Sequence, residues 1–201
     1  MKKRILCATA ALFCMIAFTA AADQSYIGFD AEGNMLISGP FNAIVPRPDG
    51  MSFDGPVNYR PSILDEELTV SIAGYYADDL LLIAQVETTD TALGTVSKQN
   101  LPTVEIAGRE HKARKFCLNF SQDEMENSGD PLIEFIARQN VQVIPAMIVW
   151  QLLDISEDGT GSGQLLLMRH LPDGCDAMTS EFKVDFDNEF EQLLASIFDA
   201  E

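Results

Sequence analysis

The chain has 201 residues and carries 31 Asp and Glu against 13 Lys and Arg, which gives a formal net charge of −18 at pH 7. Proteins that bind nucleic acid or anionic membrane surfaces need basic faces, so this balance argues against both as partners. Hydrophobic residues make up 47% of the chain, which indicates a globular rather than a disordered protein.

The first 22 residues predict a secretory signal peptide. Residues 2–4 are basic, residues 5–18 form an apolar run, and Ala20-Ala21-Ala22 offers a cleavage site. A membrane anchor would use a longer apolar run. We therefore expect cleavage after Ala22, a periplasmic or secreted mature chain, and no membrane insertion once the signal is removed.

The N-terminal part of the mature chain predicts two hairpins with a Pro-rich stretch between them. Residues 25–38 contain two short apolar runs around a turn at Glu32-Gly33-Asn34. Residues 39–61 hold five of the nine prolines, so this segment is expected to be irregular or to contain only edge strands. Alternation over residues 68–72 and the apolar run at 80–86 predict the two strands of the second hairpin.

A third hairpin is expected within residues 102–120, and its returning strand gathers positive charge. Two hypotheses explain this basic strip: docking of an anionic ligand or an acidic protein partner in the envelope, or an internally compensated edge. In the first, the histidine would tune the affinity near pH 6.5. In the second, the acidic segment at 123–130 supplies the opposite charge. We favour the second, because the charges alternate between both faces of the strand. The strip consists of Arg109, His111, Lys112, Arg114 and Lys115.

The mature chain contains two cysteines, Cys117 and Cys175, which predict one disulfide bond in an exported protein. With His111 and His170 they could instead form a tetrahedral zinc set. The spacings H-x5-C and H-x4-C match no zinc motif, so we expect the disulfide, no metal and no cofactor.

The C-terminal half predicts a helix, a hairpin and a second helix. Asp130-Pro131 is a typical helix start, and the helix should end near residue 140. Two apolar strands, at 146–155 and 164–171, flank a Gly-rich loop. Apolar residues at helical spacing over 186–198 predict a helix packed on the sheet.

The loop between the last two strands partly resembles a calcium-binding loop. Asp154, Ser156, Asp158, Gly159 and Thr160 occupy positions 1, 3, 5, 6 and 7 of such a loop, but Leu165 stands where a bidentate acid is required. We therefore expect an ordinary hairpin loop.

These elements predict a single α+β domain over residues 23–201: a largely antiparallel sheet built from hairpins, with helices near 130–140 and 186–200 packed on one face. The sequence has no G-x-S-x-G, H-E-x-x-H or C-x-x-C motif, and no catalytic residues are predicted. We expect a non-catalytic binding or accessory protein of the cell envelope. The alternative is a carboxylate-dependent hydrolase, for example one that acts on sugars.

Overall fold

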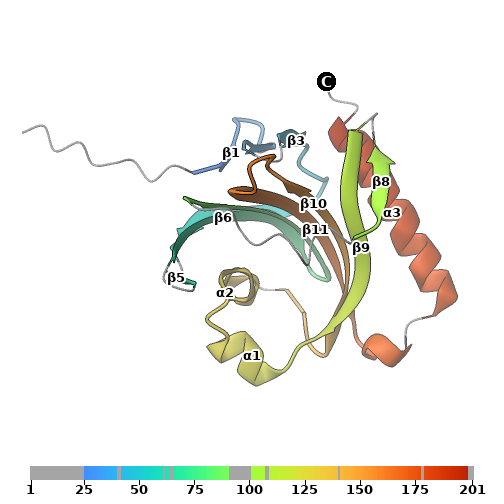
Figure 1. Ribbon diagram of the computed structural model, residues 1–201. Helices are drawn as coiled ribbons and strands as arrows, with labels where there is room; N and C mark the ends of the chain where they lie inside the picture. Colours follow the sequence, from blue (N-terminus) through green and yellow to red (C-terminus); the bar gives the residue numbers. More distant parts are fainter. Residues whose placement is uncertain are drawn as a thin grey trace, which may run out of the picture.

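The computed structural model (Figure 1) describes residues 25–39, 42–60, 62–63, 66–90, 101–106, 109–139, 141–177 and 179–198. The predicted signal peptide lies outside these residues. Two antiparallel sheets dominate the described part of the chain. The strands are β1 (Ile27–Phe29), β2 (Met35–Ile37), β3 (Ala43–Val45), β4 (Ser52–Tyr59), β5 (Ser62–Ile63), β6 (Glu66–Ala77), β7 (Leu80–Thr89), β8 (Thr103–Ile106), β9 (Arg109–Asn119), β10 (Ala146–Ile155) and β11 (Gly161–Leu171). The helices are α1 (Gln122–Asn127), α2 (Pro131–Arg138), the 3-10 helix η2 (Cys175–Ala177) and α3 (Ser180–Phe198).

The large sheet has the strand order β4-β6-β7-β11-β10-β9-β8, and β5 pairs with the end of β6. Hairpins β6-β7, β8-β9 and β10-β11 match the predicted ones, and they join through the pairs β7-β11 and β9-β10. The sheet is strongly curved (Figure 1). We call the side that holds α1 and α2 the concave face, and the side that holds the small sheet and α3 the convex face.

The α+β prediction is wrong, because the described chain is mostly β-strand and its helices cover opposite faces of the large sheet. The central strands explain this arrangement. Residues 81–86 of β7 are buried on both sides, as are most residues of β10 and β11. Strands that are apolar on both faces need cover on both faces, which helices on a single face could not provide.

Helix α2 packs against the concave face of the large sheet. Asp130 is the N-cap of α2, with its side chain accepting from the backbone N–H groups of Leu132 and Ile133. The helix then buries Phe135 and Ile136, both 1% exposed, among residues of β6, β7, β10 and β11. Burial of a phenylalanine side chain stabilises the fold by roughly 1.5–3 kcal/mol. Helix α1, which the sequence analysis did not predict, precedes α2 and begins with a capping box at Ser121 and Glu124.

The convex face carries the small sheet β1-β2-β3 and helix α3. The predicted first hairpin is present, with its turn closed by Asp30, which accepts from the backbone and side chain of Asn34. Tyr75 of β6 is fully buried under this small sheet, and its hydroxyl lies 2.9 Å from the carbonyl oxygens of both Gly33 and Val45. Burial raises the pKa of Tyr75 to about 12.

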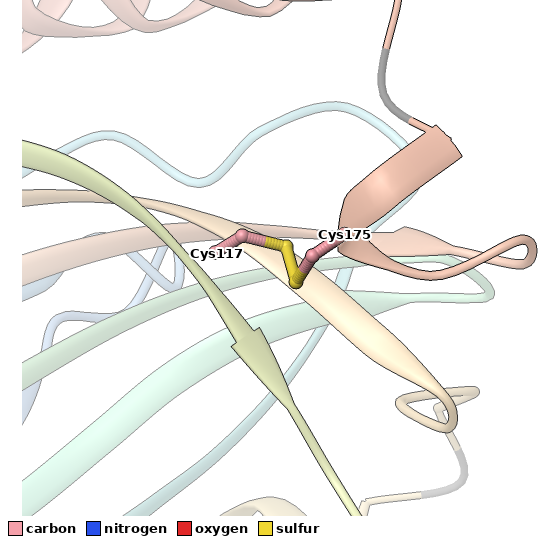
Figure 2. Close-up of a disulfide and its surroundings, with 2 residues drawn as sticks. All are labelled: Cys117 and Cys175. Atoms are coloured by element: carbon pink, nitrogen blue, oxygen red, sulfur yellow. A yellow bond between two sulfur atoms is a disulfide. The ribbon is translucent and has the colours of Figure 1, made fainter.

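Helix α3 begins six residues before the predicted start and packs along the sheet beside β8 and β9 (Figure 1). Its Phe186 and Phe190 are buried, and the Phe190 ring stacks on Trp150 with a centroid distance of 4.6 Å. The chain enters α3 through η2, and the disulfide between Cys117 of β9 and Cys175 of η2 joins this turn to the sheet (Figure 2). The structure therefore contains the predicted disulfide pair.

The Pro-rich stretch contributes edge strands, one of the two outcomes that the sequence allowed. Strand β4 lies at one edge of the large sheet, and its register against β6 shifts between Asp54 and Val57. Pro56, which has no backbone N–H, lies in this bulge. Gly55 beside it has φ +99°, and a Cβ there would lie 2.8 Å from the carbonyl oxygen of Ile72. Only glycine fits this close approach of β4 to β6.

Candidate functional site

Strand β9 divides the basic strip between the two faces of the large sheet. Lys115 lies on the convex face, where its Nζ is 2.6 Å from both carboxylate oxygens of Asp187 and 5.5 Å from the centre of the Trp150 ring. Helix α3 therefore supplies the negative charge that compensates Lys115. The acidic segment at 123–130 was the predicted source of this negative charge. Its side chains instead cap the first turns of α1 and α2 and form hydrogen bonds within α1.

Arg114 lies on the concave face. Its Nε donates a hydrogen bond to Oε1 of Gln151, and its guanidinium lies over the ring of Phe116 at 4.5 Å from the centroid. The side chain of Arg109 is outside the described residues. Among the strip residues that are described, the charges point to both sides of the sheet, so no single face presents the whole strip.

The remaining two strip residues, His111 and Lys112, line a pocket of about 240 Å³. The pocket forms where β9 and β10 separate. Their ladder runs from Asn119 opposite Ala146 to Lys112 opposite Leu153 and then stops, although β9 begins at Arg109 and β10 continues to Ile155. Beyond this point, within the described residues, β9 pairs only with β8 and β10 only with β11. The pocket is lined by Thr103, Glu110, His111, Lys112, Leu153, Asp154 and Ile155.

A buried histidine–carboxylate pair bridges the two strands at this pocket. Nδ1 of His111 is 3.0 Å from both carboxylate oxygens of Asp154. His111 is 3% exposed and Asp154 is 23% exposed, so the pair is largely withdrawn from water. Whatever the protonation state of the imidazole, an Nδ1–H donated to this carboxylate fixes the ring orientation. The pair therefore forms a rigid wall of the pocket.

The other polar lining residues come from the β8-β9 hairpin. Nζ of Lys112 donates a 2.7 Å hydrogen bond to Oγ1 of its cross-strand neighbour Thr103. Glu110 is exposed and stands directly opposite Glu105. Like charges in this position destabilise a strand pair, so the hairpin places two carboxylates beside the pocket at a cost to its own stability. The pocket thus offers an ammonium, a hydroxyl and carboxylates, with Leu153 and Ile155 as its apolar wall.

The basic strip in the sequence pointed to His111 and Lys112 but not to the other residues that line the pocket. Asp154 was considered only as a calcium ligand, and its carboxylate instead faces His111 from the end of β10. Asp158, the other acid of that loop, closes its own turn by accepting hydrogen bonds from Ser156 and Thr160. These hydrogen bonds, that from Ser156 first, lower the pKa of Asp158 to about 2. The loop residues therefore form the expected hairpin turn.

Among the described residues, no group of three or more His, Cys, Asp or Glu is placed to hold a metal ion, and no helix has the length and apolarity of a membrane span. Comparison with protein-family models, curated proteins and solved structures finds no match to this chain. The pocket is therefore the feature from which a function can be inferred.

Proposed function

We propose that the protein is an exported, non-catalytic binding protein of the cell envelope that holds a small polar ligand in the pocket between β9 and β10. The observation that carries the proposal is the composition of this pocket. A volume of about 240 Å³ is below the roughly 300–1,000 Å³ of sites for drug-sized ligands, so the ligand is small. Export is supported by the predicted signal peptide and is consistent with the disulfide.

The arrangement of the lining groups favours binding over reaction. Both carboxylate oxygens of Asp154 lie 3.0 Å from Nδ1 of His111, and Nζ of Lys112 donates a hydrogen bond to Oγ1 of Thr103. Groups held in this way have fixed directions, so they can orient a ligand without a further loss of side-chain entropy. The apolar wall of Leu153 and Ile155 excludes water from the contacts that the ligand makes.

The test is a thermal-shift and calorimetric screen of the mature protein against small amino acids, organic acids, polyols and sugars. We expect at least one class to bind. Lys112→Met removes a pocket cation and should weaken that binding about tenfold or more, because hydrogen bonds to charged groups contribute about 1.5–3 kcal/mol. Lys183→Met removes the same charge at an exposed position of α3 that does not line the pocket, and it is the matched control. Binding that both variants retain in full would contradict the proposal.

A carboxylate-dependent hydrolase is the second candidate, because two carboxylates, Glu110 and Asp154, line one pocket. Glycoside hydrolysis uses such a pair, with one carboxylic acid protonating the leaving group. We would expect turnover of chromogenic glycosides that both Glu110→Gln and Asp154→Asn abolish. The engagement of both Asp154 oxygens by His111 makes this the weaker proposal, and an absence of turnover on such a panel would remove it.

A further inference from the structure

Five of the seven residues that line the pocket lie on the concave face of the large sheet. Lys112 is the direct cross-strand partner of Thr103 on one side and of Leu153 on the other, so these three side chains form one row across β8, β9 and β10. Glu110 precedes Lys112 by two residues, and Ile155 follows Leu153 by two, so both point to the same side of the sheet. The pocket thus presents an ammonium, a hydroxyl, a carboxylate and two apolar side chains on one face.

The cationic end of this face has hydrogen-bond donors to spare. Nζ of Lys112 carries three N–H donors, and within the described part of the chain only Oγ1 of Thr103, at 2.7 Å, accepts from it. Three other basic side chains form ion pairs with carboxylates, but Lys112 forms none with a described residue. Oγ1 of Thr103 already accepts from Lys112, so its hydroxyl hydrogen remains to donate. Donors from two strands therefore lie together, as binding of a carboxylate requires.

The anionic end of the same face consists of Glu110 and its cross-strand partner Glu105. Glu110 forms no hydrogen bond or ion pair with any residue that the structure describes. Side chains that are directly opposite have Cβ atoms about 4.5–5.5 Å apart, so the two carboxylates repel each other. The register places them two residues from Thr103 and Lys112 on both strands, which is about 7 Å along the hairpin. A cationic group bound here would relieve the repulsion.

A single small ligand with both charges satisfies both ends of the pocket. A simple anion would leave the two glutamates facing each other, and a simple amine would leave the ammonium of Lys112 without a counter-charge. An amino acid is a zwitterion at neutral pH, with its carboxylate and its ammonium joined through one carbon. With a hydrogen bond of about 2.9 Å at each end, such a ligand bridges two groups that lie about 7 Å apart.

We propose that the pocket binds a small α-amino acid with an apolar side chain. This inference rests on the proposed binding function of the pocket and names the class of its ligand. Lys112 and Thr103 donate to the carboxylate of the amino acid, and Glu110 accepts from its ammonium. The apolar part of the lining, Leu153 and Ile155, lies beside these groups and contacts the side chain of the ligand.

The experiment measures binding to the mature protein by calorimetry with probes of matched shape. Alanine and valine are compared with propionate and isovalerate, which lack the ammonium, and with ethylamine and isobutylamine, which lack the carboxylate. Each amino acid should bind at least tenfold more tightly than either of its analogues, because each analogue loses one charged hydrogen-bonding group.

Two variants test the two ends of the pocket separately. Lys112→Met should weaken binding of the amino acids and the carboxylates about tenfold or more and leave binding of the amines unchanged. Glu105→Gln combined with Glu110→Gln should weaken binding of the amino acids and the amines by a similar factor and leave binding of the carboxylates no weaker. Without ligand, this double variant should melt at or above the temperature of the wild type, because it removes two opposed charges.

The matched controls remove the same charges at exposed positions that do not line the pocket. Lys183→Met on α3 is the control for Lys112→Met. Glu126→Gln on α1 combined with Glu191→Gln on α3 is the control for the double glutamate variant. Both controls should leave the dissociation constants of all six probes unchanged.

The outcomes separate this inference from the proposed function. Amino-acid binding that weakens in both pocket variants and in neither control supports the inference. Carboxylates that bind as tightly as the amino acids, or a ligand of another class whose binding the double glutamate variant does not weaken, would overturn it and leave the binding function standing. If no ligand of the wider screen binds, both proposals fail.

Discussion

Replacing both Cys117 and Cys175 by Ala should destabilise the protein by about 4 kcal/mol. The two residues are 58 positions apart in the sequence, and in the chain-entropy model the free energy scales with the logarithm of the loop that the bond closes. The loop includes α1, α2, β10 and β11. In the unfolded wild type the bond restricts the conformations of this whole segment, and the variant regains them.

Urea unfolding followed by circular dichroism measures this effect. Typical urea slopes are about 1–3 kcal/mol per M, so a loss of about 4 kcal/mol moves the unfolding midpoint down by roughly 2 M. The slope itself should rise, because an unfolded chain without the crosslink exposes more surface. Reducing agent added to the wild type should reproduce the midpoint of the variant, while the variant itself should not respond. A midpoint shift below about 0.5 M would refute the reasoning, since the bond would then contribute little to the restriction of the unfolded chain.

Three further predictions concern single side chains. Burial raises the pKa of Tyr75 to about 12, so the stability that its neutral hydroxyl confers is complete below about pH 10 and is lost as the pH rises towards 12. Tyr75→Phe should lower the free energy of unfolding in urea by about 1 kcal/mol at pH 7, and its stability should fall less steeply at alkaline pH. An equally steep alkaline fall in the variant would contradict this. Asp187 accepts a 2.8 Å hydrogen bond from Nε1 of Trp150, the only tryptophan in the sequence. Asp187→Ala should shift the tryptophan fluorescence emission to the red and lower the free energy of unfolding by about 1–3 kcal/mol. Asn188→Ala, on the same helix, should change neither quantity. The turn hydrogen bonds lower the pKa of Asp158 to about 2, so their contribution to stability is present above about pH 4 and is lost as the pH falls through 2. The difference in stability between the wild type and Asp158→Ala should therefore shrink over this pH interval. A constant difference would mean that the turn hydrogen bonds do not cause it.

Local elements of this fold could be predicted from the sequence, because their signals lie within a few residues of each other. Helix α2 follows from Asp130-Pro131 and its apolar stripe, and the β10-β11 hairpin follows from two apolar runs around a Gly-rich loop. The fold class could not be predicted in the same way. Whether α2 and α3 share a face depends on the pairing of β7 with β11 and of β9 with β10, which connects segments far apart in the chain. No local periodicity encodes that pairing.

The candidate site was only half predictable for the same reason. His111 and Lys112 stood out as part of a basic strip in an acidic chain. Their pocket exists because the β9-β10 ladder stops at Lys112 and Leu153, and Asp154 faces His111 because of that register. A shift of one residue would turn Asp154 to the opposite face of the sheet. The site is therefore a product of strand register, which the positions of the charged residues alone do not reveal.

The bulge at Pro56 has a consequence for how the protein behaves in concentrated solution. A sheet with a regular outer strand offers unpaired N–H and C=O groups to any second chain, and such strands promote aggregation. Strand β4 interrupts that row with a proline and a register shift, and β8 at the other edge spans only Thr103–Ile106 and carries Glu105. Both outer strands are therefore poor templates for a further strand. The large sheet therefore resists growth into a fibril by the addition of strands from other copies of the chain.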